Sequence, residues 1–269
     1  MEKNQKKFIK LILKYYKNTD SLTIFDIGAR DCEESVNFSK IFPKSRIFSF
    51  ECNPQVIPTA ERKIKSATNI KLVKKALSNT EGTIDFFPID CEKSRTKHID
   101  GNPGASSLFK IENYPKNEFY VQKHIKVPTT TLSNFMSHEK IKKIDIIWMD
   151  VQGAELMVLE GLKDKIENIG LIHTEVEFVR IYKNQPLFSD IKKYLNGKGF
   201  SLLTFTSFSR YFGDAIFINN KLNSGKNFAR DKYIYYYYKT VGIYIIYIGY
   251  ITTFMKNLLN FKRKVNRTD

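Results

Sequence analysis

The sequence predicts an α/β fold, a doubly wound and mostly parallel β-sheet with an antiparallel strand near its C-terminal end. Three observations predict it. Apolar runs alternate with helix-like segments through residues 21–200, as they do around a parallel sheet. Two runs end in an acid just before a Gly turn, at Asp26-Ile-Gly28 and Asp150-Val-Gln-Gly153. The last two runs flank the polar turn 210–214, which is typical of antiparallel neighbours.

The first half of the chain supplies three strands with helices between them. The apolar run 21–27 is typical of a buried strand, and the next segment opens with acids, which suit the positive end of a helix dipole. A short strand follows the turn Asn79-Thr-Glu-Gly82. The stretch 88–127 is polar and too long for a simple connector, so we predict a lid or substrate loop there. The expected elements are strands at 21–27, 46–51, 70–76 and 82–87 and helices at 31–42 and 54–65.

Strands and helices continue to alternate after the polar stretch. The run 144–149 is the fourth strand, and a helix follows its Gly turn. The fifth strand carries His173, Glu175 and Glu177 on one face, a polar row that an ordinary buried strand would avoid. The expected elements are helices at 131–136, 154–162 and 189–197 and strands at 144–149, 171–178, 201–205 and 215–219.

The net charge of +16 is concentrated at the two ends of the chain. Residues 1–20 carry six Lys against two acids, and residues 221–269 carry ten Lys or Arg against two acids. Only +4 remains for residues 21–220. We therefore predict an amphipathic helix in 1–20, a catalytic domain at 21–220 and a basic helical tail at 221–269.

The tail differs in composition from the rest of the chain. Residues 233–255 hold eight Tyr and a single charge, Lys239. This length would span a bilayer only if the Lys and two Gly are tolerated, and its apolar residues do not segregate to one face. Two interpretations stay open: attachment to an anionic membrane, or a helical pair that packs on the domain or on a second subunit of a homo-oligomer.

The cysteines indicate a reducing compartment. Cys32, Cys52 and Cys91 have no metal-ligand spacing and make an odd number, which is typical of free thiols. The N-terminal residues lack the pattern of a secretory signal peptide. We expect a cytoplasmic protein, either free or peripheral at the membrane through its tail.

An adenosine ligand is predicted at the ends of the first two strands. Glu51 follows Asp26 by 25 residues, where an acid can accept both ribose hydroxyls. The turn 28–34 holds three carboxylates, which disfavours the pyrophosphate of NAD(P). S-adenosylmethionine has no phosphate and carries a sulfonium cation, so it is the preferred cofactor. The predicted cofactor-binding residues are Asp26, Ile27, Gly28, Ala29, Glu51 and Cys52.

Over residues 22–219 the sequence resembles the FkbM family of S-adenosylmethionine-dependent methyltransferases. The most discriminating motif is Met149-Asp-Val-Gln-Gly-Ala-Glu155. The supporting motifs, in order, are Phe25-Asp-Ile-Gly-Ala29, Phe50-Glu51, Asn53-Pro54, Lys75-Ala-Leu-Ser78, Gly104-Ala-Ser-Ser-Leu108, Val127-Pro-Thr-Thr-Thr-Leu132, Leu159-Glu-Gly161 and Gly213-Asp-Ala-Ile-Phe217. Cys32 departs from the family, which often has a second Gly there. The resemblance implies the class I methyltransferase (Rossmann-like) fold and O-methylation of a hydroxyl on a sugar, polyketide or similar small molecule.

Methyl transfer to an alcohol needs alignment and a general base, because an alcohol is a poor nucleophile. Asp150 ends the fourth strand and is the preferred base, with Glu175 next; Glu155 and His173 are further catalytic candidates. The alternatives are a helix cap for Asp150, a dipole partner for Glu155 and a structural His173. We assign no metal ligands, because no ligand set has metal spacing; a divalent ion held by paired carboxylates, as in some O-methyltransferases, stays an alternative. The predicted substrate-binding residues are Ser106, Ser107, Gln152 and Glu177.

Two other functions stay open beside O-methylation of a small molecule or glycan. A nucleic-acid methyltransferase would use the basic termini and the tyrosines for base stacking, but the fourth strand lacks the Asn/Asp-Pro-Pro-aromatic run that grips a flipped base. A non-catalytic, membrane-associated scaffold would explain the tail. We expect a small-molecule or glycan acceptor and no nucleic-acid partner.

Overall fold

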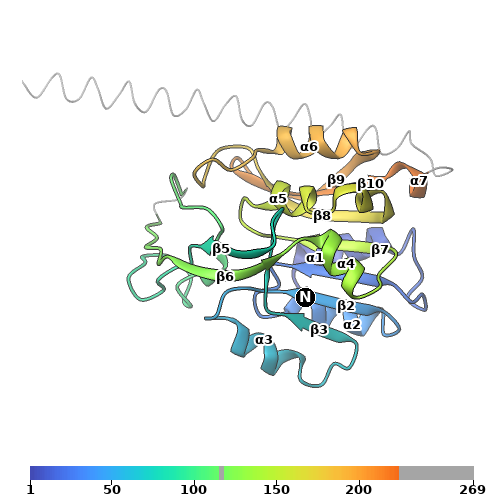
Figure 1. Ribbon diagram of the computed structural model, residues 1–269, viewed down its shortest axis with the longest axis horizontal. Helices are drawn as coiled ribbons and strands as arrows, with labels where there is room; N and C mark the ends of the chain where they lie inside the picture. Colours follow the sequence, from blue (N-terminus) through green and yellow to red (C-terminus); the bar gives the residue numbers. More distant parts are fainter. Residues whose placement is uncertain (115–117, 224–269) are drawn as a thin grey trace, which may run out of the picture.

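The computed structural model describes residues 1–114 and 118–223, and a seven-stranded sheet forms its centre (Figure 1). The strands are β1 (Thr23–Ile27), β2 (Arg46–Phe50), β3 (Ile70–Val73), β7 (Ile144–Met149), β8 (Ile169–Glu177), β9 (Phe200–Phe208) and β10 (Phe212–Asn219). Their order in the sheet is β3-β2-β1-β7-β8-β10-β9. Neighbours from β3 to β8 are parallel, and β10 is antiparallel to both β8 and β9. The predicted doubly wound sheet, mostly parallel with an antiparallel C-terminal strand, is confirmed.

A second, three-stranded sheet was not predicted as such. It consists of β4 (Ala76–Leu77), β6 (Ile125–Thr130) and β5 (Gly82–Phe86), in that order. The expected single strand 70–76 is wrong, because the chain leaves β3 at the exposed pair Lys74 and Lys75 and joins the small sheet. The run 125–130 was partly assigned to the polar loop. It is short and contains Pro128, so its local signal is weak, and pairing with β5 stabilises it.

Helices cover both faces of the main sheet because its strands alternate two sets of apolar side chains. On one face, Ile24, Ile47 and Ile146 pack with α1 (Lys3–Ile12) and α2 (Glu33–Ile41). On the other face, Phe25, Phe48 and Ile147 pack with α4 (Leu132–His138), α5 (Glu155–Glu160) and α6 (Phe188–Gly197). The remaining elements are α3 (Ile57–Ile64), η1 (Pro103–Ala105), η2 (Lys163–Asn168) and α7 (Asn220–Asn223).

The predicted N-terminal helix is present as α1, and it packs directly on the main sheet. Phe8 is fully buried, and its ring lies 5.5 Å from the Trp148 ring and 4.9 Å from the His173 ring. Ile9 and Ile12 join the same cluster, which leaves the lysines of the helix on the outside. The helix therefore completes the cover of this face.

The polar stretch after β5 is tied to the rest of the fold. Isolated bridges join Phe87 to Ser107, Ile89 to Gln122 and Ile111 to Tyr182. Figure 1 shows this stretch and the small sheet together at one end of the main sheet. The predicted tail span at 233–255 lies outside the described residues. Within the described residues, no helix combines the length and apolar character needed to cross a bilayer.

Phe8→Ala should lower the free energy of unfolding by about 3 kcal/mol or more, because it removes a fully buried ring between α1 and the sheet. Urea denaturation followed by circular dichroism measures this change. Leu13→Ala, at an exposed position just after the same helix, is the control and should change the value by no more than about 0.5 kcal/mol. Equal losses in the two variants would contradict the described packing of α1.

Candidate functional site

The turns after β1 and β7 touch each other. The Asp150 N–H donates to the Ile27 carbonyl over 2.9 Å. Gly28 has a φ of +79°, and a Cβ built on it would lie 1.9 Å from the Asp150 carbonyl oxygen. Only glycine fits a backbone this close in this conformation. The Gly28 of the predicted motif is thus required by geometry, and it brings the ends of β1 and β7 together.

A largely apolar cavity opens beside this contact. Its volume is about 600 Å³, including its open mouth. The predicted residues Ile27, Gly28, Glu51 and Cys52 line it, whereas Asp26 and Ala29 do not. Other lining side chains are Phe50, Val56, Leu77, Phe86 and Leu108. We call this space the apolar cavity; four of the six predicted cofactor residues meet there.

Glu51 is the principal acid of the apolar cavity. It is 8% exposed, and its two carboxylate oxygens accept the backbone N–H groups of Arg30 (2.8 Å) and Asn53 (2.7 Å). Burial raises the pKa of Glu51 to about 7, although these hydrogen bonds act in the opposite direction. A carboxylate offers about four acceptor positions, so Glu51 can still accept from a ligand.

Asp26 lies on the other side of β1. It is 1% exposed, and its carboxylate accepts a hydrogen bond of 2.5 Å from the Ser35 hydroxyl, which lies 2.6 Å from the Ser49 hydroxyl. Burial raises the pKa of Asp26 to about 7. Its side chain therefore joins β1, β2 and α2, and any effect on a ligand would pass through the backbone of the turn.

A larger polar cavity adjoins the first. Its volume is about 1670 Å³, including open solvent, and its lining includes Asn4, Tyr114, Trp148, His173, Glu175 and Asp214. Gly28, Arg30, Gly104, Asp150 and Gln152 line both spaces. We call this space the polar cavity. The two cavities meet where β1 and β7 end.

Gln152 connects the acidic residues at this junction. Its amide nitrogen donates to Asp150 Oδ1 and to Glu175 Oε2, over 2.7 Å in each case. Its amide oxygen lies 2.7 Å from the Tyr182 hydroxyl, which is fully buried. Gln152 has a φ of +53°, a strained conformation for a non-glycine residue. This network fixes the side chains of Asp150 and Glu175 relative to each other.

Burial shifts the pKa of both carboxyl groups at the junction upward. Asp150 is open to the cavities but lies deep in the protein, and this burial raises the pKa of its carboxyl. Burial also raises the pKa of Glu175 well above its usual range, and the neighbouring Asp150 adds to the effect. Groups with raised pKa values can accept a proton at neutral pH.

Two of the predicted acids lie behind the junction. Glu155 is fully buried, and its Oε1 accepts the N–H groups of Val151 (3.1 Å) and Gly153 (3.3 Å). It thus shapes the turn between β7 and α5, in agreement with its alternative interpretation as a helix-terminus residue. Glu177 is 1% exposed. Neither side chain lines the apolar or the polar cavity.

His173 lies in the wall of the polar cavity. Its ring stacks on Trp148 with centroids 3.8 Å apart, and its Nε2 lies 2.8 Å from the Thr206 hydroxyl. Burial lowers its pKa to about 3, so the ring is neutral. These contacts agree with the alternative of a structural histidine, although one ring nitrogen, Nδ1, has no partner among the described residues.

The predicted serines hold the loop after β5 in place. The Ser106 hydroxyl donates to the Pro103 carbonyl (2.7 Å) and accepts the Ile89 N–H (3.0 Å), and Ser106 lines the apolar cavity. The Ser107 hydroxyl donates to the Gln152 carbonyl over 2.7 Å and lines neither cavity. Both residues thus act on the site through the loop.

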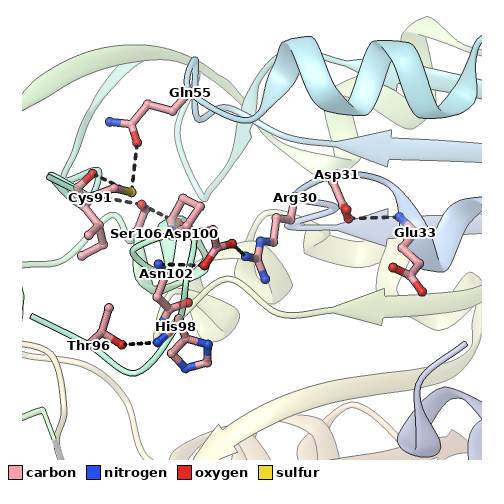
Figure 2. A network of polar contacts seen from close by, with 12 residues as sticks. Arg30, Asp31, Glu33, Gln55, Cys91, Thr96, His98, Asp100, Asn102 and Ser106 are labelled. Carbon is pink, nitrogen blue, oxygen red and sulfur yellow. Dashed lines mark hydrogen bonds and ion pairs between the residues drawn. The ribbon is translucent and has the colours of Figure 1, made fainter. Parts of the chain in front are cut away.

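An ion pair holds the loop over the junction. Arg30, in the turn after β1, pairs with Asp100 in the loop, and the Asp100 carboxylate also accepts the Asn102 N–H over 3.0 Å (Figure 2). Both partners are partly exposed, so the pair itself contributes little to stability. Its effect is to position the loop against the turn that both cavities share.

Several residues of the site were not predicted. Asp214 lies inside the motif Gly213–Phe217, but its position carried no assigned role, and Tyr182 lies outside the motifs named above. Arg30 lies in the turn 28–34, in which only the carboxylates were given a role. Asn4 lies in a helix considered only for its charge. Among the described residues, no group of three or more His, Cys, Asp or Glu could hold a metal ion.

Comparisons with known proteins agree on one family. The family described as "Methyltransferase FkbM domain" matches residues 26–202. The chain is 29% identical over 168 residues to "2-O-methyltransferase NoeI" of Sinorhizobium fredii, covering 60% of this chain and 66% of that protein. It is 25% identical over 189 residues to "Methyltransferase 1" of Beauveria bassiana, covering 68% of this chain and 74% of that protein.

A solved structure is also similar in fold. The crystal structure of Methyltransferase FkbM from Methylobacillus flagellatus KT superposes with a TM-score of 0.46 at 14% identity. The superposition covers 74% of this chain and 44% of that one. The chain thus spans less than half of the length of that protein.

Glu155→Gln should flatten the dependence of stability on pH. Burial raises the pKa of Glu155 from 4.5 to about 7 in the folded protein, so the folded state holds a proton that the unfolded state releases within this window. Stability from this group is complete below pH 4.5 and falls as the pH rises towards 7, by up to about 1.4 kcal/mol per pH unit. Urea denaturation at several pH values should show a correspondingly smaller slope for the variant. Glu160→Gln, at the exposed end of the same helix, should keep the wild-type slope; equal slopes for Glu155→Gln and wild type would contradict this assignment.

Proposed function

The chain belongs to the FkbM family of methyltransferases, and on this basis we propose that it transfers a methyl group from S-adenosylmethionine to a hydroxyl group of a small molecule or a glycan. The observation that carries the proposal is the junction: Asp150 and Gln152 line both the apolar and the polar cavity. A donor in one cavity and an acceptor in the other would meet beside a carboxyl group. The relative named 2-O-methyltransferase supports an oxygen acceptor.

The apolar cavity fits the cofactor by its chemistry. Its apolar side chains suit an adenine ring, and Glu51 can still accept from the ribose hydroxyls. The carboxylates of Asp31 and Glu33 line only the polar cavity, where a sulfonium cation is tolerated and a pyrophosphate would be repelled. Glu51, Gly28 and Ile27 are the residues that would hold the cofactor. When bound, S-adenosylmethionine supplies an electrophilic methyl group.

Asp150 is the proposed general base. Burial raises the pKa of its carboxyl, which makes it a stronger proton acceptor than an ordinary Asp. Gln152 holds its carboxylate in one orientation, and Tyr182 in turn holds Gln152. Glu175, on the same amide, is the second candidate. Alignment of the acceptor by this fixed network supplies the rest of the acceleration.

Glu51→Ala should weaken S-adenosylmethionine binding by about tenfold or more, because the acceptor of the ribose hydroxyls is lost. Isothermal titration calorimetry with the full chain measures the dissociation constant. Glu61→Ala, which removes an exposed carboxylate from α3, is the matched control and should bind as the wild type does. Unchanged affinity in Glu51→Ala would remove the main support for the cofactor site.

Asp150→Asn should lower methyl transfer by about 100-fold or more while the dissociation constant of the cofactor changes little. The assay incubates the protein with methyl-labelled S-adenosylmethionine and fractionated cell extract, and follows where the label goes. Labelling at the wild-type rate by Asp150→Asn would transfer the role of base to Glu175, for which Glu175→Gln is the next variant.

A further inference from the structure

The wall of the polar cavity that β8 and β10 form holds two acids directly opposite each other. Glu175 on β8 and Asp214 on β10 are paired residues of antiparallel strands, and both line the cavity. Like charges directly opposite on neighbouring strands destabilise a sheet. Asp214 also raises the pKa of Glu175, after the larger effects of burial, of Asp150 and of Glu177. A cation placed between the two carboxylates would remove this cost.

No side-chain cation of the described residues fills that role. None of the ion pairs among residues 1–114 and 118–223 involves Asp150, Glu175 or Asp214. Lys7 acts on Asp214 from a distance, but its ammonium donates to the Thr206 carbonyl over 2.5 Å. The lining of the cavity holds eight Asp or Glu against one Arg and one Lys. The cavity is thus acidic in a chain whose net charge is +16.

The acidic wall is held in place by α1. Asn4 donates through its amide nitrogen to Asp214 Oδ2 over 2.8 Å, and the Ser207 hydroxyl donates to the same oxygen. Phe8 of the same helix packs against Trp148 on β7 and His173 on β8. This helix lies outside residues 26–202, which match the family. The wall is therefore a fixed surface, and part of it comes from residues outside the matched range.

A second observation at the same wall points to a ligand. His173 lines the polar cavity and is 2% exposed, yet its Nδ1 has no hydrogen-bond partner among the described residues. A buried polar atom without a partner is costly, and a bound polar group can satisfy it. Because the Thr206 hydroxyl can donate to or accept from Nε2, Nδ1 can be either a donor or an acceptor.

We propose that the polar cavity binds an acceptor glycan that carries an amino group, with the ammonium held between Glu175 and Asp214 and a hydroxyl presented to Asp150. The proposal rests on the proposed function and adds that the cavity selects its acceptor by the acceptor's charge. Amino-bearing glycans bind best, their N-acylated forms bind more weakly, and glycans with carboxylate groups are repelled by the wall.

Trp148 makes the test independent of turnover. It is the single Trp of the chain, and it lines the polar cavity. Its fluorescence should therefore report binding in titrations of the full chain, and Trp148→Phe removes the signal. The probes are trisaccharides of glucosamine, of N-acetylglucosamine and of galacturonic acid, at a pH where the amines are protonated. Glucosamine should bind about tenfold tighter or more than the acetylated form, and galacturonic acid should give no saturable change.

Asp214→Asn is the decisive variant, because it removes one charge and keeps the shape of the side chain. It should reduce the preference for the amine to about threefold or less, whereas Asp164→Asn, an exposed acid in η2, should keep it. Unchanged melting temperature and cofactor affinity show that the variant is folded. A preference that survives in Asp214→Asn overturns the subsite, as does equal binding of the acetylated or the acidic probe.

The outcomes separate this inference from the proposed function. If the wild type binds S-adenosylmethionine but none of the three probes changes the Trp148 signal, the amine subsite is wrong and the methyltransferase proposal stands. If S-adenosylmethionine does not bind the wild type in calorimetry, the proposed function fails, and the subsite fails with it.

Discussion

The contact between the turn after β1 and the end of β7 determines the rest of the site. Gly28 lets the backbone reach the Asp150 carbonyl at a distance that no side chain would permit. That approach places the apolar cavity on one side of the turn and the polar cavity on the other. Asp150 and Gln152, which follow from β7, then lie at the boundary of both spaces. A small shift of either strand end would move the Asp150 carboxylate away from the boundary between the two cavities.

Much of the fold was predictable because parallel strands have strong local signals. The runs that became β1, β2 and β7 are apolar on both faces, and their carboxyl ends must meet at one edge of the sheet. The small sheet was not predictable in the same way. β4 has two residues, and β6 pairs across a loop of nearly forty residues, so their stability comes from distant partners rather than from local pattern.

The sequence predicted which positions along the chain contribute to the site. It predicted less well the direction in which their side chains point. Glu51 lies in the apolar cavity as expected, whereas Asp26 faces the opposite side of β1 and Glu155 turns back onto the β7–α5 turn. Alternation along β1 places Asp26 on the same face as Ile24, whereas it does not apply to Glu155, which follows the turn after β7. Gln152 adopts a positive φ, and its network depends on Tyr182, thirty residues later, which no local pattern can indicate.

Tyr182 links the turn between β7 and α5 to the loop after β5. Its hydroxyl contacts Gln152, while the backbone on either side of it bonds the loop after β5, through Glu112 N–H to the Ile181 carbonyl and Lys183 N–H to the Lys110 carbonyl. Detachment of the loop would withdraw the phenol from the amide and release the carboxylate that the amide aligns. The orientation of the Asp150 carboxylate and the attachment of the loop after β5 therefore depend on the same short segment around Tyr182.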